Sequence, residues 1–396
     1  MSFRRIQHDV DTGSATPGLR WLIALLQNAL GAGTDDGGKS PPIDANSLAD
    51  LLRRHRVGPF LSRRLDGDFL ASLPPTHQAV LRDADQRNAT LSLTRSAELV
   101  RIARRLNEAR VQFVSVKGPL LARTLYGEVG ARHSGDLDLL VHPGAVPAAD
   151  RVLRAAGYRR SQPSFELTPR QWTAFQQLKH EFEYLNKSAS VRLEIEWRLS
   201  GLNQMSPDEL VSSASATQLA GTTIARLPET LEFLYLFVHG AGHAWFRLFW
   251  LVDVSLLLQR PDMDWPALMQ LARTHGVETC VWQGALLAER LFGIPTPAAI
   301  GIPIEEVDGI PRLTREAWRM IQSSDAERDR VIEVFRQLAY QMRLRKGWKK
   351  RAAVLRPLLG MPENWRVLSL PDSCFALYTP LAPALWAWRR LGRRTS

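Results

Sequence analysis

The chain has 396 residues, more than one hydrophobic core usually covers, so we expect two or three structural units. Its apolar content of 45% and charged content of 23% are those of an ordinary globular protein. The two cysteines, Cys280 and Cys374, are too few and too far apart for a disulfide framework, which favours a reducing, cytoplasmic location.

The sequence also argues against secretion and membrane insertion. The amino terminus has no apolar segment after its basic residues, as a secretory signal would require. The longest uncharged runs, 233–246 and 373–388, are shorter than the roughly 20 residues of a membrane-spanning helix. We therefore expect a soluble protein.

Helical periodicity dominates the N-terminal region, residues 1–95. Apolar side chains recur at helical spacing over 17–32, 45–65 and 76–111. The first two segments are separated by a Gly-rich stretch, 31–44, that we expect to be a flexible loop.

This loop contains a segment that matches a nucleotide-binding pattern. Gly33–Ser40, GTDDGGKS, fits G-x4-G-K-S/T, a pattern that wraps phosphates with backbone amides between a strand and a helix. Here a helix precedes the segment, and Pro41 and Pro42 follow it immediately. We interpret it as a linker and expect no nucleotide site there.

The chain changes character between residues 96 and 228, which we expect to form the catalytic core. Strand-like patterns occur in VQFVSV, DLDLLVH, EFEYLN and VRLEIEWRL, and KSAS is a plausible hairpin turn between the last two. Helical periodicity returns over 229–396. The sequence thus predicts an α+β fold, in which mainly helical N- and C-terminal regions flank a small mixed sheet.

Two aspartates stand one residue apart in front of an apolar run. On a strand, Asp136 and Asp138 share one face at about 7 Å, while Leu137 and Leu139 point into the core. Like charges at that distance repel, and a divalent cation turns the repulsion into a binding site. Hard carboxylate oxygens suit magnesium better than zinc. The alternative is a solvated strand start, where Asp is common.

A glycine turn lies upstream of the aspartates. The strand VQFVSV ends at Lys117 and Gly118, and Pro119 begins a helix. A helix N-terminus presents free amides and a positive dipole to an anion, and Lys117 adds a full charge. The arrangement suits a nucleoside triphosphate, whereas the alternative is a simple connection with a solvent-facing lysine.

A later strand carries two glutamates. In VRLEIEWRL the apolar and charged residues alternate, so Glu194 and Glu196 both face the side where a metal would lie. Periodicity does not choose between them. The alternative is an exposed strand face with Arg–Glu pairs.

Two histidines lie one turn apart in the C-terminal region. His239 and His243 have a zinc-binding spacing, but the glutamate of H-E-x-x-H is missing. We interpret them as core histidines bonded to Asp253 or to a backbone carbonyl. The wall of an acceptor pocket is the alternative.

The segment VKGPLLARTLYGEVGARHSGDLDLLV, residues 116–141, resembles the nucleotidyltransferase-fold superfamily. It resembles more closely a poorly characterised bacterial branch with a Lys-Gly turn, an arginine shortly before D-x-D and long helical flanks. Later blocks, including HEFEYLN, LEIEWRL and SLPDSCFALYTP, extend the resemblance over most of residues 50–390.

The resemblance implies transfer of a nucleoside monophosphate from a triphosphate (NTP) to an acceptor with the help of two Mg²⁺ ions. It implies three metal-binding, catalytic carboxylates, Asp136, Asp138 and Glu194. It also implies a nucleotide-binding set, consisting of Lys117, Gly118, Arg132 and Ser134. The acceptor-side set consists of Glu196, His180, His239 and His243.

Two departures from the superfamily pattern affect these roles, and the acceptor is open. The superfamily usually has Ser where this chain has Pro119, and the branch often has His where this chain has Glu196. The branch resembles tailoring enzymes of natural-product and surface-polysaccharide pathways. A peptide, sugar or lipid-linked acceptor is therefore expected rather than a nucleic acid.

The positive charge is concentrated at the C-terminal end. Of the formal net charge of +11, the last 56 residues contribute +10, from twelve basic and two acidic residues. Such an end, including Arg389, Arg390, Arg393 and Arg394, suits a phosphate-rich partner or an acidic membrane surface, or is simply solvated. A non-catalytic interaction module of the same fold is the alternative to the enzyme.

Overall fold

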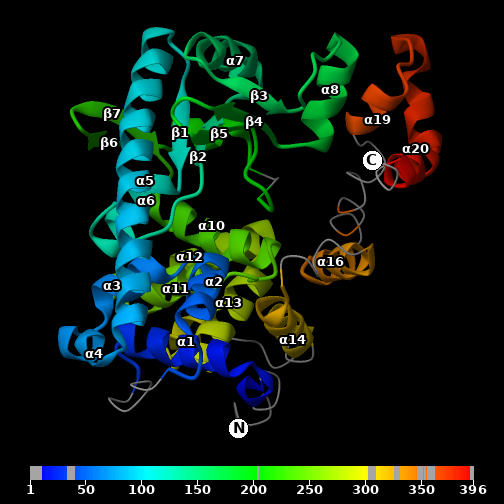
Figure 1. The fold of residues 1–396 in the computed structure, drawn as a ribbon. Coiled ribbons are helices and arrows are strands. Elements are labelled where there is room, and N and C mark those ends of the chain that lie inside the picture. The colour runs from blue at the N-terminus through cyan, green and yellow to red at the C-terminus, as the bar shows by residue number, and fades with distance from the viewer. Residues whose placement is uncertain are drawn as a thin grey trace.

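The computed structural model describes most of the chain, with gaps near both ends and in several loops (Figure 1). The described residues are 11–33, 41–202, 205–301, 309–324, 331–345, 351, 354 and 362–392. Within these ranges, short 3-10 helices occur at Thr12–Ser14, Pro143–Ala145, Ala298–Ile300 and Asp372–Leu377.

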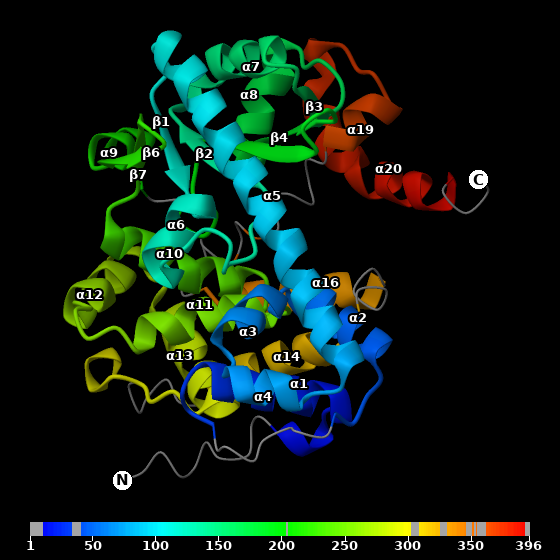
Figure 2. The ribbon, with the colours of Figure 1, turned by 60° about the vertical axis from the view of Figure 1, so that its left-hand side comes forward.

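Five helices form the N-terminal part: α1 Pro17–Ala29, α2 Ala45–His55, α3 Gly58–Arg64, α4 Gly67–Ser72 and α5 Pro75–Glu108. Thr16 and Asp44 cap α1 and α2 by accepting hydrogen bonds from backbone amides of the first turn. The segment 45–65, expected to be helical, is two helices, because Arg56 ends α2 in the left-handed conformation at φ 59°. The long helix α5 runs from α2 and α3 to the sheet (Figures 1 and 2).

The centre is a mixed seven-stranded sheet in the order β3-β4-β5-β2-β1-β7-β6. Its strands are β1 Phe113–Val116, β2 Leu137–Val141, β3 Arg159–Gln162, β4 Glu181–Asn186, β5 Val191–Glu196, β6 Ser215–Leu219 and β7 Thr222–Arg226. β2 pairs parallel with β5 and β1 with β7, whereas the other pairs are antiparallel. The predicted α+β fold class and the KSAS hairpin are confirmed; β3, β6 and β7 make the sheet larger than expected.

One face of the sheet is apolar and covered by helices. Leu139 of β2, Leu193 of β5 and Tyr184 of β4 are fully buried in one core cluster with Leu99 of α5 and Leu153 of α7. The helices in the connections between consecutive strands are α6 Gly118–Tyr126, α7 Val146–Ala155, α8 Pro169–Leu178 and α9 Pro207–Ser212. The opposite side of β2, β5 and β4 carries acidic residues and is free for a site.

The C-terminal part is helical. Its helices are α10 Glu229–Gly242, α11 Leu248–Leu258, α12 Trp265–His275, α13 Glu278–Phe292, α14 Gly309–Gln322, α16 Val331–Arg343, α19 Pro362–Val367 and α20 Tyr378–Gly392. Residues of α1 to α3 and of α10 to α14 share one hydrophobic cluster, so the two helical regions form a common core. In contrast, Trp365 of α19 and Tyr378 of α20 belong to the core of the sheet.

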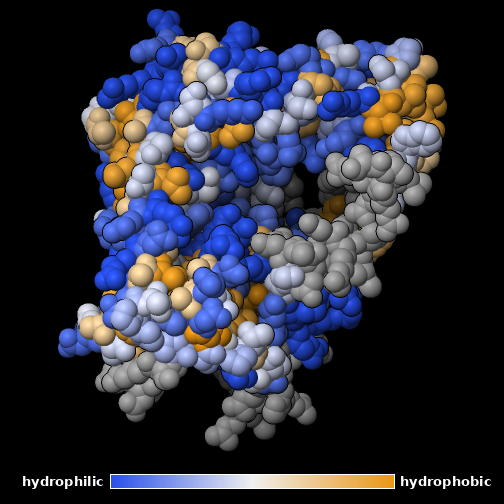
Figure 3. Space-filling model, in the orientation of Figure 1, coloured by the Kyte–Doolittle hydropathy of each residue, from blue (hydrophilic) through white to orange (hydrophobic). Residues whose placement is uncertain are grey.

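The face of the molecule in Figure 3 is mainly polar. Hydrophilic residues cover most of the face in Figure 3, and hydrophobic ones form scattered patches. Within the described part of the chain, no helix is both long enough and apolar enough to cross a membrane.

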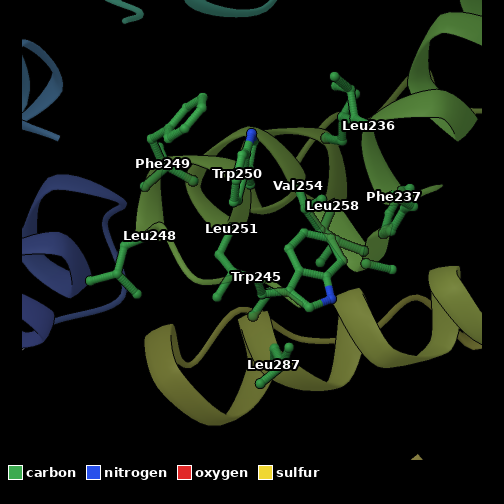
Figure 4. Close-up of a cluster of buried hydrophobic side chains, with 14 of the residues drawn as sticks. Leu236, Phe237, Trp245, Leu248, Phe249, Trp250, Leu251, Val254, Leu258 and Leu287 are labelled. Atoms are coloured by element: carbon green, nitrogen blue, oxygen red, sulfur yellow. The ribbon is translucent and has the colours of Figure 1, made fainter. Parts of the chain in front are cut away.

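A close glycine contact explains how the turn after α10 packs. Trp245 is fully buried among side chains of α10, α11 and α13 (Figure 4), and its Nε1 donates to Gln283 Oε1 at 3.1 Å. A Cβ atom on Gly240 would lie 2.2 Å from Cζ3 of the Trp245 ring. Only glycine therefore lets the ring lie against the α10 backbone.

We predict that Gly240→Ala lowers the free energy of unfolding by about 1–3 kcal/mol, because the buried ring must shift to avoid overpacking. Urea unfolding measures the change. Gly242→Ala in the same helix is the control, since its Cβ meets nothing within 4 Å and its stability should be unchanged or higher. Equal urea midpoints for the two variants would contradict this packing.

Candidate functional site

Every residue that the sequence assigns to metal, nucleotide or acceptor lines one cavity of about 560 Å³. The strands β2, β4 and β5 form one side of it, and α10 and the turn that leads into α11 form another. The size lies in the usual range for small-molecule sites. Residues from the centre and the C-terminal half of the chain thus meet at a single place.

Three carboxylates converge in the cavity. Asp138 in β2 is paired in register with Glu194 in the parallel strand β5, and Asp136 directly precedes β2. One oxygen from each of the three lies within 4.8 Å of the others. The three acidic residues that the resemblance implies as ligands are therefore close enough to hold one cation.

A second group of carboxylates overlaps the first. Glu181 of β4 lies opposite Glu196 of β5, and one oxygen of each comes within 4.8 Å of Glu194. Glu196 is only 3% exposed, and its Oε2 has no hydrogen-bond partner within the described ranges. Glu181 escaped the sequence reasoning, although the alternation in EFEYLN already turns it toward the face of Glu194 and Glu196.

Burial and crowding make these carboxylates hard to ionise. Burial, and then the charge of Asp138, raise the pKa of Glu194 to about 10. Burial also raises the pKa of Asp138 to about 6, although Lys117 opposes the shift, and the pKa of Glu196 is well above its ordinary value for similar reasons. The site is therefore short of positive charge, which a bound cation would supply.

Lys117 faces this acidic group and is not exposed to solvent. It adopts φ 56° and ψ −131°, and α6 begins at Gly118 with Pro119 in its first turn. Its Nζ lies 3.1 Å from Asp138 Oδ2 and over the Tyr235 ring, 5.3 Å from the centroid. Burial lowers the pKa of Lys117, but Asp138, Tyr235 and Glu196 together outweigh it and raise the pKa well above the ordinary value. The alternative of a solvent-facing lysine is wrong, since Lys117 is 9% exposed.

Arg132 forms a buried ion pair that links the loop before β2 to α11. Its Nε donates to Asp253 Oδ1 at 2.9 Å and its Nη2 to Oδ2 at 2.8 Å, and Tyr126 Oη donates to Oδ1 at 2.6 Å. Arg132 and Asp253 are 5% and 1% exposed. Ser134 Oγ donates to the Asp136 carbonyl at 3.2 Å in the same loop.

The two histidines belong to the cavity wall. Asp253, which the sequence suggests as a histidine partner, accepts hydrogen bonds from Arg132 and Tyr126. The His239 and His243 ring centroids are 4.7 Å apart, and His243 stacks on Trp250 at 5.0 Å with an interplanar angle of 13°. Burial lowers the pKa of His239 well below its ordinary value. Both therefore suit an aromatic wall better than a zinc site.

Two further titratable residues, His180 and Cys280, line the cavity. His180 Nε2 lies 3.2 Å from Glu181 Oε2 at the rim of the acidic group. Cys280 also lines the cavity, but burial raises the pKa of its thiol to about 12, so it stays protonated at neutral pH.

Two sequence features fall partly or wholly outside the described residues. The phosphate-loop pattern does so over 34–40, and the basic end over 346–350, 352–353, 355–361 and 393–396. Of the basic end, Arg389 Nη1 lies 3.6 Å from Glu363 Oε2. The described residues therefore test neither the prediction that Gly33–Ser40 is a linker nor the prediction that the basic end binds an anionic partner.

Comparison with known families identifies the chain. The family described as an uncharacterised nucleotidyltransferase matches residues 41–293, more than half of the sequence. The protein therefore belongs to this nucleotidyltransferase family. No curated protein and no solved structure shows significant similarity to it. All the cavity residues that the sequence singled out lie inside the matched range.

We predict that Asp253→Asn lowers the free energy of unfolding by about 3–5 kcal/mol, because it leaves the Arg132 charge buried without a counter-charge. Denaturant unfolding measures the loss. The control is Asp50→Asn, which removes the exposed partner of Arg53 and should change stability by less than about 1 kcal/mol. A similar small effect for both variants would show that the buried pair is dispensable.

We predict that Glu194→Gln raises the melting temperature of the protein in a metal chelator. The folded-state pKa of Glu194 is raised to about 10 from an ordinary 4.5, so the stability conferred by its bound proton is fully present below pH 4.5 and is lost as pH rises toward 10. Glutamine does not titrate, so the advantage of the variant should grow from pH 5 to pH 9. Scanning calorimetry across this range tests it, and a pH-independent difference would refute it.

Proposed function

We propose that this protein is a cytoplasmic, Mg²⁺-dependent enzyme that transfers a nucleoside monophosphate from an NTP to an acceptor. The observation that carries the proposal is the convergence of Asp136, Asp138 and Glu194 within 4.8 Å in a cavity of this family member. A small-molecule, peptide or saccharide acceptor is preferred to a nucleic acid, and natural-product or surface-polysaccharide biosynthesis is the proposed setting.

The donor set fits magnesium. The ligand atoms are carboxylate oxygens, which hard divalent cations prefer, and their pKa values are raised by burial and mutual repulsion. Glu181 also lies within 4.8 Å of Glu194, and these two carboxylates would lie beside a second ion. Bound magnesium would neutralise charge on the triphosphate and make the α-phosphorus a better target for attack.

The protein side chains divide the remaining work. Lys117 holds the Asp138 carboxylate by their 3.1 Å ion pair, and Gly118, where α6 begins, lines the cavity beside them. Arg132 and Ser134 fix the loop that presents Asp136. These contacts keep the ligands in position against their mutual repulsion, so little rearrangement is needed when metal and nucleotide bind.

We assign proton transfer to Glu196. In the reaction the acceptor oxygen forms a bond to the α-phosphorus, the bond to pyrophosphate breaks, and the acceptor hydroxyl loses its proton. Glu196 lines the cavity, its Oε2 has no hydrogen-bond partner among the described residues, and its pKa is raised. A bound cation would bring the raised pKa of Glu196 down toward neutral, where a carboxylate is a suitable general base.

The acceptor side is aromatic. His239, His243 and Trp250 form a continuous ring cluster on the cavity wall. Such a wall suits the flat or apolar faces of a sugar, a peptide side chain or a nucleobase.

The test is a search for the product. The protein is incubated with each NTP, labelled at the α-phosphate, with Mg²⁺ and a metabolite extract, and products are identified by mass spectrometry. The proposal predicts a metal-dependent metabolite that is heavier by one nucleoside monophosphate residue, together with pyrophosphate. Absence of any labelled product with every NTP would favour the non-catalytic interaction module.

We predict that Asp136→Asn reduces transfer by roughly a thousandfold, or about 4 kcal/mol of activation free energy, without lowering stability. Asp136 is a cleaner test than Asp138, because Asp138→Asn also removes the ion-pair partner of Lys117. Asp208→Asn, at a side chain that is 85% exposed, is the control and should keep full activity. Initial rates with labelled NTP measure the effect. If Asp136→Asn transfers at the wild-type rate, Asp136 is not a metal ligand.

A further inference from the structure

Positive charge from distant parts of the chain gathers beside Asp136. Arg56 ends α2, Arg95 lies on α5 and Arg192 lies on β5. Arg56 and Arg192 line the cavity, and Arg56 is close enough to Asp136, Arg95 and Arg192 to interact electrostatically with each. None of these arginines belongs to a motif in the sequence.

Arg56 is held in an unfavourable backbone conformation. Its φ of 59° and ψ of 32° lie in the left-handed region, where glycine or asparagine is more stable. Its guanidinium lies against the loop before β2, since a Cβ on Gly135 would be 3.3 Å from Arg56 Nη1. It also lies over the Phe249 ring at 5.8 Å. An arginine kept at such a position points to a role for its side chain.

Arg95 carries buried donors without acceptors. It is 8% exposed, and its Nε and Nη1 find no hydrogen-bond partner within the described ranges of the chain. Unpaired buried donors of a charged group are costly, so an acceptor from outside the chain would stabilise them.

Two other cations near the carboxylates are already paired. Lys117 contacts Asp138, and Arg132 contacts Asp253 through two nitrogens. The negative charge of Asp136 interacts with both Arg56 and Arg95. When Asp136 binds a cation, as proposed, that cation balances its charge instead. Positive charge on Arg56 and Arg95 is then left for an anion, and Arg192, whose charge also acts on Glu183, adds to it. Guanidinium groups match phosphate oxygens well.

We propose that Arg56, Arg95 and Arg192 form an anion subsite that binds the two terminal phosphates of the NTP. The inference rests on the proposed function and deepens it. It assigns the phosphate chain to arginines from the helical flank and β5, whereas Lys117 serves the carboxylates. An anionic group on the acceptor has the same chemistry, and the experiment separates the two sources.

The key variant is Arg56→Asn, because asparagine tolerates the left-handed conformation and the variant should fold at least as well as the wild type. Calorimetric titration with inorganic pyrophosphate in Mg²⁺ should give at least tenfold weaker binding, while titration with the nucleoside monophosphate should be unchanged. The control is Arg53→Asn, three residues earlier in the same helix, whose side chain is 75% exposed. Wild-type pyrophosphate affinity in Arg56→Asn would overturn the proposal.

A second variant and a competition complete the test. Arg95→Met, checked for native folding by circular dichroism, should also weaken pyrophosphate binding at least tenfold. Pyrophosphate should compete with the NTP on the wild type, whereas simultaneous binding of both would assign the subsite to the acceptor and overturn the proposal.

These experiments distinguish failure of the anion subsite from failure of the proposed enzyme activity. Loss of pyrophosphate binding in Arg56→Asn, combined with no transfer by the wild type, would keep the anion subsite and reject the enzyme. Transfer by the wild type with unchanged pyrophosphate binding in Arg56→Asn would keep the enzyme and reject the subsite.

Discussion

Repulsion among buried carboxylates is the constraint on which the rest of the structure depends. Asp138, Glu194, Glu196 and Glu181 project from three adjacent strands onto one face, and Asp136 joins them at the start of β2. Close to these groups, Lys117 offsets part of the charge. Such a cluster stays together only if the backbone that bears it is rigid. The sheet provides that rigidity, because its opposite face is packed against α5 and α7.

The helical regions complete the site and fix its loop. The Arg132–Asp253 pair joins the segment before β2 to α11, and Tyr126 of α6 bonds to the same carboxylate. The helices α10 and α11 also provide the aromatic wall, and α2 brings Arg56 to the loop at Gly135. In the proposed function, the metal ligands lie on or beside strands and the aromatic wall on helices, which separates the reacting centre from the parts that would select substrates.

The sequence predicted the parts of the site that depend on local pattern. Alternation placed Asp136 with Asp138 and Glu194 with Glu196, because the two-residue period of a strand decides which side chains share a face. It did not reveal Arg56, since its approach to Gly135 joins residues far apart in sequence. The end of α2 at Arg56 was partly predictable, because the Gly-Pro pair that starts α3 favours a new helix there. The burial of Lys117 was missed because it depends on α10, which lies more than one hundred residues later.

The central claim is that the carboxylate cluster is a divalent-cation site. The most direct measurement is anomalous diffraction from crystals of the protein grown with Mn²⁺ and a non-hydrolysable NTP analogue. The account predicts an anomalous peak within bonding distance of Asp136, Asp138 and Glu194, with the phosphates of the analogue beside it. A structure in which the analogue is bound but the manganese lies elsewhere, or is absent from these carboxylates, would contradict it.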